Sequence, residues 1–406
     1  MTSSTAPAVP SLDASFRAWI DGMRPFAAVS PVASAWLDEW QKAGDRAAAW
    51  PKVIEAVKSR KAWATPYDVV VTEGPIRLIR FRAPEGGQAS NRRYATPILM
   101  VFALVNRPYV LDILPHKSVV RQFLKGGHDV WMIDWAAPEP GDHTKTLHDY
   151  VEGHIHRFVE RVLRDTKQTQ LNLFGYCMGG TMSAMYTSLH QKLVRNLVLL
   201  AAPFDWSRGD GLLKTWTDER SFDVDAVVEA FGNVPPAFLG QSFNMLKPID
   251  NNLRKWLGFA EKMTDEKFLQ EFVAMESWVN DNIPISGAVY RDFVRYGIQR
   301  NQLVKGTFPL GPNLIDLKQI TCPVLNLVAE NDHLVPREQS DPIDRLVGST
   351  DVSTRSIKSG HIGLAVSGKA HLEMWPAAAE WLGHRSEIAP GESGAATAAP
   401  RDSDRT

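Results

Sequence analysis

Apolar residues along the chain fall into two kinds of pattern. Short continuous apolar runs recur, and stretches with helical spacing of apolar residues separate most of them. Such runs are typical of strands buried on both faces of a parallel sheet. The apolar runs that predict strands are 98–102, 129–135, 170–174, 194–200 and 324–329, and a further β-pattern lies at 352–357. Helices are predicted near 118–125, 147–165 and 372–382. This alternation predicts an α/β fold, with a mostly parallel sheet and helices on both of its faces.

Two further β-patterns, 67–72 and 76–81, precede these runs. They are separated only by Glu73, Gly74 and Pro75. Short neighbouring strands joined by such a turn indicate an antiparallel hairpin, which we expect at an edge of the sheet.

The strand pattern stops after Pro203 and resumes only at 324–329 and 352–357. The intervening stretch, 204–307, holds amphipathic patches that include Phe268, Phe272 and Trp278, with Pro and Gly between them. It is too long to be a loop of a compact domain, so it predicts a helical cap or lid insertion.

The rest of the chain completes the predicted organisation. The region before the first strand carries Trp36, Trp40, Ile54 and Val57 at helical spacing, and we expect it to pack on the core or to form a contact surface. The small, polar start of the chain and its Gly- and Ala-rich end are typical of disorder. The predicted parts are a disordered N-terminus (1–11), N-terminal helices (12–62), the first part of the core (63–203), the cap or lid (204–307), the second part of the core (308–387) and a disordered tail (388–406).

Composition and charge narrow the class of protein. The chain of 406 residues is 44% hydrophobic and 22% charged, which is ordinary for a globular enzyme. Lys and Arg total 45 against 46 for Asp and Glu, so the net charge of −1 gives no reason to expect a nucleic-acid partner. The sequence has neither a secretory signal pattern nor an apolar run long enough for a transmembrane segment, and we expect a cytoplasmic protein.

The two cysteines are too few for a disulfide framework or a thiolate metal site. Cys322 precedes Pro323 at the start of an apolar run, which is typical of a small buried residue. Cys177 differs, because Gly175 and Gly179 flank it between a predicted strand and a predicted helix. We expect these glycines to let the backbone turn sharply, so that the reactive side chain stands alone at the top of the sheet. Here that side chain is a thiol, where most such elbows carry a hydroxyl.

A thiol nucleophile needs a base, and the base needs an acidic partner that fixes its tautomer. After an elbow of this kind the acid comes first along the chain and the histidine second, each beyond a late strand. Asp332 follows the predicted strand 324–329 and His361 follows the predicted strand 352–357, so we expect them to be the acid and the base. Glu330 and His333 are rivals, and they rank lower because alternate positions at a strand end point to opposite sides.

Attack of a thiol on an acyl carbonyl forms an oxyanion, which needs two backbone N–H donors. One donor should be the N–H of Met178, the residue after the nucleophile at the start of a helix. The other should come from the loop after the run at 98–102. Val105 is the preferred donor there, while Asn106 is either an alternative donor or a turn residue.

The sequence resembles the polyhydroxyalkanoate synthases, most closely the short catalytic subunits of the two-component classes III and IV. The segments that carry the resemblance are 102–109, 134–135, 175–181, 245–248, 275–278, 322–326, 332–336 and 360–363. The Gly-x-Cys-x-Gly-Gly elbow together with the Asn-Arg-Pro-Tyr loop is the most specific part of the match.

This resemblance implies an α/β-hydrolase fold with a cap, and an acyltransferase that polymerises (R)-3-hydroxyacyl-CoA into polyhydroxyalkanoate with release of CoA. Cys177 would be the acylated residue, His361 the general base and Asp332 its partner. The resemblance further implies a smaller accessory subunit, a homodimer and a place at the surface of polyester granules. It implies neither a metal nor a bound cofactor, since CoA is the leaving group of the substrate.

Two other functions remain open. A hydrolase of esters or thioesters could use the same fold and a cysteine nucleophile. A non-catalytic granule-binding homologue could use the Trp-rich helices, but it would have no need of the complete set of predicted catalytic residues. The basic residues Arg291, Arg295 and Arg300 belong either to a solvated helix face or to a binding site for CoA phosphates.

Overall fold

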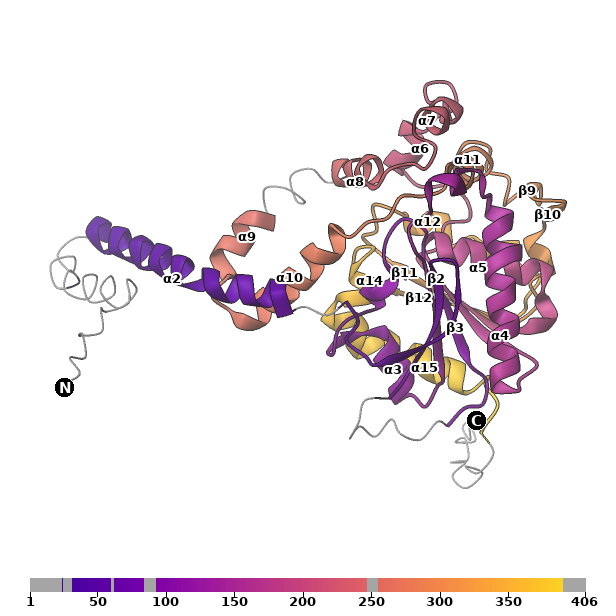
Figure 1. Cartoon of the computed structure of the whole chain (residues 1–406), viewed down its shortest axis with the longest axis horizontal. Coiled ribbons are helices and arrows are strands. Elements are labelled where there is room, and N and C mark those ends of the chain that lie inside the picture. Colours follow the sequence, from indigo (N-terminus) through magenta and orange to yellow (C-terminus); the bar gives the residue numbers. More distant parts are fainter. Residues whose placement is uncertain (1–23, 25–30, 60–61, 84–92, 247–254, 390–406) are drawn as a thin grey trace, which may run out of the picture. The chain divides into compact units, whose positions relative to one another are not determined.

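The computed structural model describes residues 24, 31–59, 62–83, 93–246 and 255–389 (Figure 1). The chain divides into two compact units, a smaller one of Met1–Lys61 and Lys247–Ser277 and a larger one of Ala62–Leu246 and Trp278–Thr406. The predicted disordered N-terminus and most of the predicted disordered tail lie outside the described residues. The first two residues of that tail are ordered, because Ile388 forms a β-bridge with Tyr94 and the Ala389 N–H donates to the Arg93 carbonyl at 2.9 Å.

The larger unit is built on an eight-stranded sheet with the order β1-β2-β6-β3-β7-β8-β11-β12. The strands are β1 (Tyr67–Glu73), β2 (Ile76–Phe81), β3 (Ile98–Val101), β6 (Val130–Asp134), β7 (Leu171–Tyr176), β8 (Val194–Leu200), β11 (Val324–Ala329) and β12 (Val352–Ile357). Strand β2 pairs antiparallel with β1 and β6, whereas the other neighbours pair in parallel. The sheet is therefore mostly parallel, and β1 and β2 form the predicted hairpin at its edge.

Helices cover both faces of the sheet (Figure 1). The principal ones are α3 (Val119–Lys125), α4 (His156–Thr166), α5 (Met178–Leu189) and α15 (Trp375–Gly383). Neighbouring residues on β7 show the two sides, since consecutive side chains of a strand point to opposite faces. The ring of Phe174 packs against Phe123 of α3 and against Trp375 of α15. Gly175 faces Ser183 of α5 instead.

Two of the predicted helices are less regular than expected, because each begins with a π-helix. The helix predicted at 147–165 begins with a π-helix, η4 (Asp149–Ile155), before α4, and a second π-helix, η9 (Ala370–Met374), precedes α15. The sequence also gave no sign of three short elements in the larger unit: the β4–β5 pair (Asp112–Leu114, Lys117–Ser118), the β9–β10 hairpin (Phe308–Leu310, Asn313–Ile315) and η2 (Pro108–Leu111). Their strands have at most three residues, too few for a period to be read.

The insertion predicted as one cap at 204–307 is helical, but it is shared between the two units. Its helices are α6 (Leu212–Trp216), α7 (Val224–Phe231), α8 (Pro236–Met245), α9 (Lys255–Lys262), α10 (Glu266–Val279), α11 (Gly287–Asp292) and the π-helix η7 (Phe293–Gln299). Its middle part, Lys247–Ser277, groups with the N-terminal residues. The single-cap prediction therefore needs correction, because apolar residues of α9 and α10 pack on an N-terminal helix.

That N-terminal helix is α2 (Pro31–Ser59), which continues through Pro51. Its buried face carries Ala49 and Val53, which join a core of Phe259, Met263, Leu269 and Val273 from the inserted helices. Ile54 and Val57 are exposed, so they are not the packing positions of this helix. The side chains of Trp36 and Trp40 lie outside the described residues. Over the described ranges, no helix has the length and apolar character needed to cross a membrane.

Candidate active site

Cys177 lies at the turn between β7 and α5. Its backbone has φ 55° and ψ −126°, a positive φ that is rare and costly for a residue other than glycine. Backbone hydrogen bonds hold this conformation: the Cys177 N–H donates to the Leu200 carbonyl at 2.8 Å, and the Cys177 carbonyl accepts from the Gly180 N–H at 2.8 Å. The strained residue of the elbow is thus the cysteine itself, whose side chain is partly exposed.

The glycines beside Cys177 are needed for close packing, and neither has a positive φ. A Cβ on Gly175 would lie 2.6 Å from the Gly179 carbonyl oxygen, and one on Gly179 would lie 2.7 Å from the Phe102 carbonyl carbon. The expectation that these glycines allow the sharp turn of the backbone is therefore wrong, because neither adopts a conformation that only glycine favours. They let α5 approach β7 and the end of β3.

His361 and Asp332 lie together at the carboxyl ends of two neighbouring strands. β11 and β12 are paired in parallel as far as Ala329 and Ile357, so the loops that follow them meet at one edge of the sheet. His361 Nδ1 lies 2.7 Å from Asp332 Oδ2, and both side chains are nearly inaccessible to solvent. The Oδ1 atom of Asp332 accepts hydrogen bonds from the Leu334 and Val335 N–H groups, both at 2.9 Å, which fix the carboxylate.

The environment of His361 favours its charged form. Burial lowers the pKa of His361, but the negative charges of Asp332 and Cys177 and its hydrogen bonds with both outweigh burial and raise the pKa to about 10. Because Nδ1 faces Asp332, Nε2 is the nitrogen left for the Cys177 thiol. The ring of Tyr176 stacks on His361 with centroids 5.2 Å apart, and the Tyr176 hydroxyl donates to the His361 carbonyl at 2.9 Å. Tyr176 is a supporting residue that sequence reasoning missed, although it is the residue before the nucleophile.

The two rivals for these roles point to solvent. Glu330 and His333 are exposed, and the Glu330 carboxylate accepts a hydrogen bond from Ser356 Oγ at 3.1 Å. The structure brings together Cys177, His361 and Asp332, and it leaves these neighbours outside the cluster.

The loop after β3 lies against the start of α5. Gly179 is packed on the Val101 and Phe102 carbonyls, and Met178 is the buried first residue of α5. Val105 lies in this loop and is half-buried. These contacts agree with an oxyanion hole at the elbow, and the N–H groups of Met178 and Val105 stay its predicted donors.

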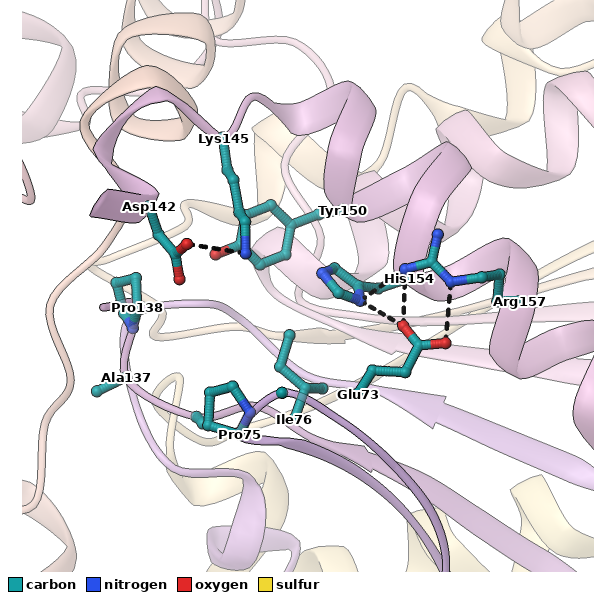
Figure 2. A pocket seen from close by; sticks show the side chains of 12 residues that line it. Glu73, Pro75, Ile76, Ala137, Pro138, Asp142, Lys145, Tyr150, His154 and Arg157 are labelled. Atoms are coloured by element: carbon teal, nitrogen blue, oxygen red, sulfur yellow. Dashed lines mark hydrogen bonds and ion pairs between the residues drawn. The ribbon is translucent and has the colours of Figure 1, made fainter. Parts of the chain in front are cut away.

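A pocket of about 330 Å³ opens near the end of β1 (Figure 2). Arg157 Nη2 and His154 Nδ1 lie 2.7 and 2.8 Å from Glu73 Oε2, and Lys145 Nζ lies 2.9 Å from Asp142 Oδ1. Burial, stronger than the effect of the Glu73 hydrogen bond, lowers the pKa of His154. The cations of this pocket are therefore already paired with carboxylates. No sequence pattern pointed to it, because its lining comes from segments far apart in the chain.

The arginines near 291–300 form ion pairs within the larger unit. Arg291 Nε lies 2.7 Å from Asp225 Oδ1, and Arg295 binds the other oxygen of the same carboxylate. Arg300 Nη2 lies 2.9 Å from Glu219 Oε1. These contacts connect α11, η7 and the residue after it to α7 and the segment before α7. The three arginines therefore stabilise the packing of these helices.

Cys322 is 6% exposed, as expected for a small core residue. Burial raises the pKa of its thiol to about 11, so it is uncharged and unreactive near neutral pH. Of the two cysteines, only Cys177 combines partial exposure with a histidine partner.

The fold and this site define a class. A family model described as the alpha/beta hydrolase fold matches residues 110–366, which is more than half of the chain. A poly(3-hydroxyalkanoate) polymerase subunit PhaC from Haloferax mediterranei is 38% identical over 87% of this chain and 72% of that protein. The same subunit from Allochromatium vinosum is 38% identical over 79% of this chain and 89% of that protein. The chain therefore belongs to the PhaC family of poly(3-hydroxyalkanoate) polymerase subunits, within the α/β-hydrolase fold.

Solved structures resemble the chain more distantly. A monoacylglycerol lipase from Paleococcus ferrophilus covers 72% of this chain with 98% of its own length, at 15% identity and a TM-score of 0.43. That likeness is too weak to carry any conclusion about activity.

Proposed function

We propose that this chain polymerises (R)-3-hydroxyacyl-CoA into polyhydroxyalkanoate, with release of CoA, through a thioester on Cys177. The names of relatives at 38% identity support the reaction. The observation that carries the mechanism is the thiol on the elbow beside a buried His361–Asp332 pair joined at 2.7 Å.

The first half-reaction is a thioester exchange. The raised pKa of His361 favours transfer of the Cys177 thiol proton to its imidazole, and the resulting thiolate attacks the carbonyl carbon of the acyl-CoA. The resulting oxyanion is stabilised by the N–H groups of Met178 and Val105. The carbon–sulfur bond to CoA then breaks, the CoA thiolate takes the proton from His361, and the acyl group stays on Cys177. One thioester replaces another, so the acyl group remains activated.

The second half-reaction forms the ester. The 3-hydroxyl of another hydroxyacyl unit or of a chain end attacks the acyl-Cys177 carbonyl, while His361 removes the hydroxyl proton. The carbon–sulfur bond breaks and the Cys177 thiol recovers that proton from His361. Asp332 holds the imidazole in the required orientation throughout. Each step uses groups of the protein and substrate alone, so the reaction requires no bound cofactor or metal.

The wider assembly is also part of the proposal. The word subunit in the relatives' names supports a smaller accessory partner, and the resemblance in sequence implies a homodimer. Since the product is an insoluble polyester, the enzyme would work at the surface of a granule in the cytoplasm, where acyl-CoA is available.

The proposed polymerisation is tested by supplying (R)-3-hydroxybutyryl-CoA to the full chain, with and without its accessory subunit. We expect CoA release together with insoluble polymer. CoA release that yields only free hydroxy acid would instead identify a hydrolase.

The nucleophile is tested separately with butyryl-CoA, which has no 3-hydroxyl and cannot extend the chain. Mass spectrometry should find the butyryl group on the peptide that contains Cys177. Cys177→Ala should lose both acylation and CoA release, whereas the matched Cys322→Ala variant should keep them. Acylation of Cys177→Ala would rule out the proposed nucleophile.

A further inference from the structure

The loop that carries Val105 is anchored to the sheet by Trp135. The indole Nε1–H of Trp135 donates to the Phe102 carbonyl at 2.9 Å, and Arg107 Nη1 donates to the Trp135 carbonyl at 3.3 Å. These bonds fix the loop on the side of β6, directly after the end of that strand.

The same loop is held on its other side by two residues of one short segment. The indole Nε1–H of Trp278 donates to the Arg107 carbonyl at 2.7 Å. The hydroxyl of Tyr109 donates to Asp281 Oδ2 at 2.9 Å, and Arg107 Nε lies 3.6 Å from Asp281 Oδ1. Trp278 and Tyr109 are each 3% exposed, so both aromatic donors are buried, whereas the Asp281 side chain that accepts from Tyr109 is 46% exposed.

Buried indole and phenol groups need hydrogen-bond partners, because an unpaired polar group that is shielded from water is destabilising. Here each such bond acts on the backbone or side chain of a residue within four positions of Val105. A backbone donor for an oxyanion must be held within about 0.5 Å of its working position. The bonds around Arg107 and Tyr109 restrict the movement of this loop.

We propose that Trp278 and Asp281 are positioning residues for the oxyanion loop. They hold Arg107 and Tyr109, and through them they set the place of the Val105 N–H relative to the elbow. This inference rests on the proposed acyl-transfer function. Neither residue touches the reacting atoms. Trp278 lies near the end of α10, and it is the first residue after Ser277 that belongs to the larger unit.

Two substitutions each remove one bond and keep the aromatic ring: Trp278→Phe and Tyr109→Phe. We expect kcat for CoA release to fall about 10- to 100-fold in each, because misplacing an oxyanion donor weakens transition-state binding. KM should change little. The rate at which iodoacetamide alkylates Cys177 should not change, since that displacement forms no oxyanion. The matched control is Trp256→Phe, an exposed tryptophan of α9, which should keep the wild-type kcat.

A comparison of a conservative and a non-conservative substitution of Asp281 supplies a further test. Asp281→Asn keeps an oxygen that accepts from Tyr109, so it should retain more activity than Asp281→Ala. Wild-type kcat in both Trp278→Phe and Tyr109→Phe would overturn the inference, and so would an equal loss of acylation and alkylation. If Trp278→Phe fails to fold, Tyr109→Phe decides alone. A wild-type protein that releases no CoA would instead overturn the proposed function.

Discussion

At the scale of single residues, the site depends on how each buried polar group is partnered. Asp332 uses one carboxylate oxygen for two backbone N–H groups and the other for His361, so its charge is both fixed and matched. Cys177 carries the strain of a positive φ at the turn between β7 and α5. Both residues are held by the ends of parallel strands.

Asp332→Asn should lower kcat roughly 10²- to 10⁴-fold, because an amide no longer fixes the imidazole tautomer or stabilises its charge. The measurement is the initial rate of CoA release. The exposed Asp344→Asn serves as the matched control and should be unaffected. A rate near that of the wild type would contradict the assigned role.

The same variant should change the dependence of stability on pH. The folded-state pKa of His361 is about 10, above the value of about 6.5 expected in the unfolded chain. Its protonation therefore adds stability that is complete below about pH 6.5 and is lost as pH rises through about 10. Urea unfolding from pH 6 to 10 should show the difference in free energy between wild type and Asp332→Asn shrinking as pH rises. A difference that stays constant would contradict this coupling.

At the scale of elements, α5 packs closely against the sheet because the residues at their contact include three glycines. Gly175, Gly179 and Gly180 all face backbone or a side chain at distances that leave no room for a Cβ. This close approach brings the N-terminus of α5 beside the loop after β3, where the predicted oxyanion donors lie.

Gly179→Ala should destabilise the larger unit by about 1–3 kcal/mol and lower CoA release, because the added methyl must displace the Val101–Phe102 backbone. Thermal unfolding and the initial rate measure the two effects. Gly141→Ala is the matched control, since a Cβ there meets no heavy atom within 4 Å. If the two variants behaved alike, the close approach of α5 would not matter.

At the scale of the whole molecule, the inserted helices serve two units. α9 and α10 bury their apolar residues with Ala49 and Val53 of α2, while α11 and η7 belong to the larger unit. Domains with separate cores can open independently of each other.

Leu269→Ala should destabilise the smaller unit by about 2–5 kcal/mol, since Leu269 is 3% exposed in its core. Hydrogen exchange measured by mass spectrometry should show faster exchange in α2 and α9 and unchanged exchange in β7. The control is Leu257→Ala, a side chain that is 56% exposed. Equal loss of protection in β7 would mean that the two units unfold as one.

The sequence by itself determined the features that depend on local pattern. The apolar runs placed the buried strands because a strand covered on both faces is made mostly of apolar residues. The order Cys177, Asp332, His361 follows from which strands end beside the elbow. The motifs around Cys177 and 106–109 also indicated the family, which the comparisons confirmed.

Only the tertiary structure decided which distant segments share a core or a contact. No periodicity could pair α2 with Leu269, because both are amphipathic helices that many partners would fit. Nor could it find the bond between Trp278 and the Arg107 carbonyl, which joins residues 171 positions apart. Such contacts depend on how the elements pack in space. For the same reason the glycines of the elbow proved to serve close packing, while the strained conformation belongs to Cys177.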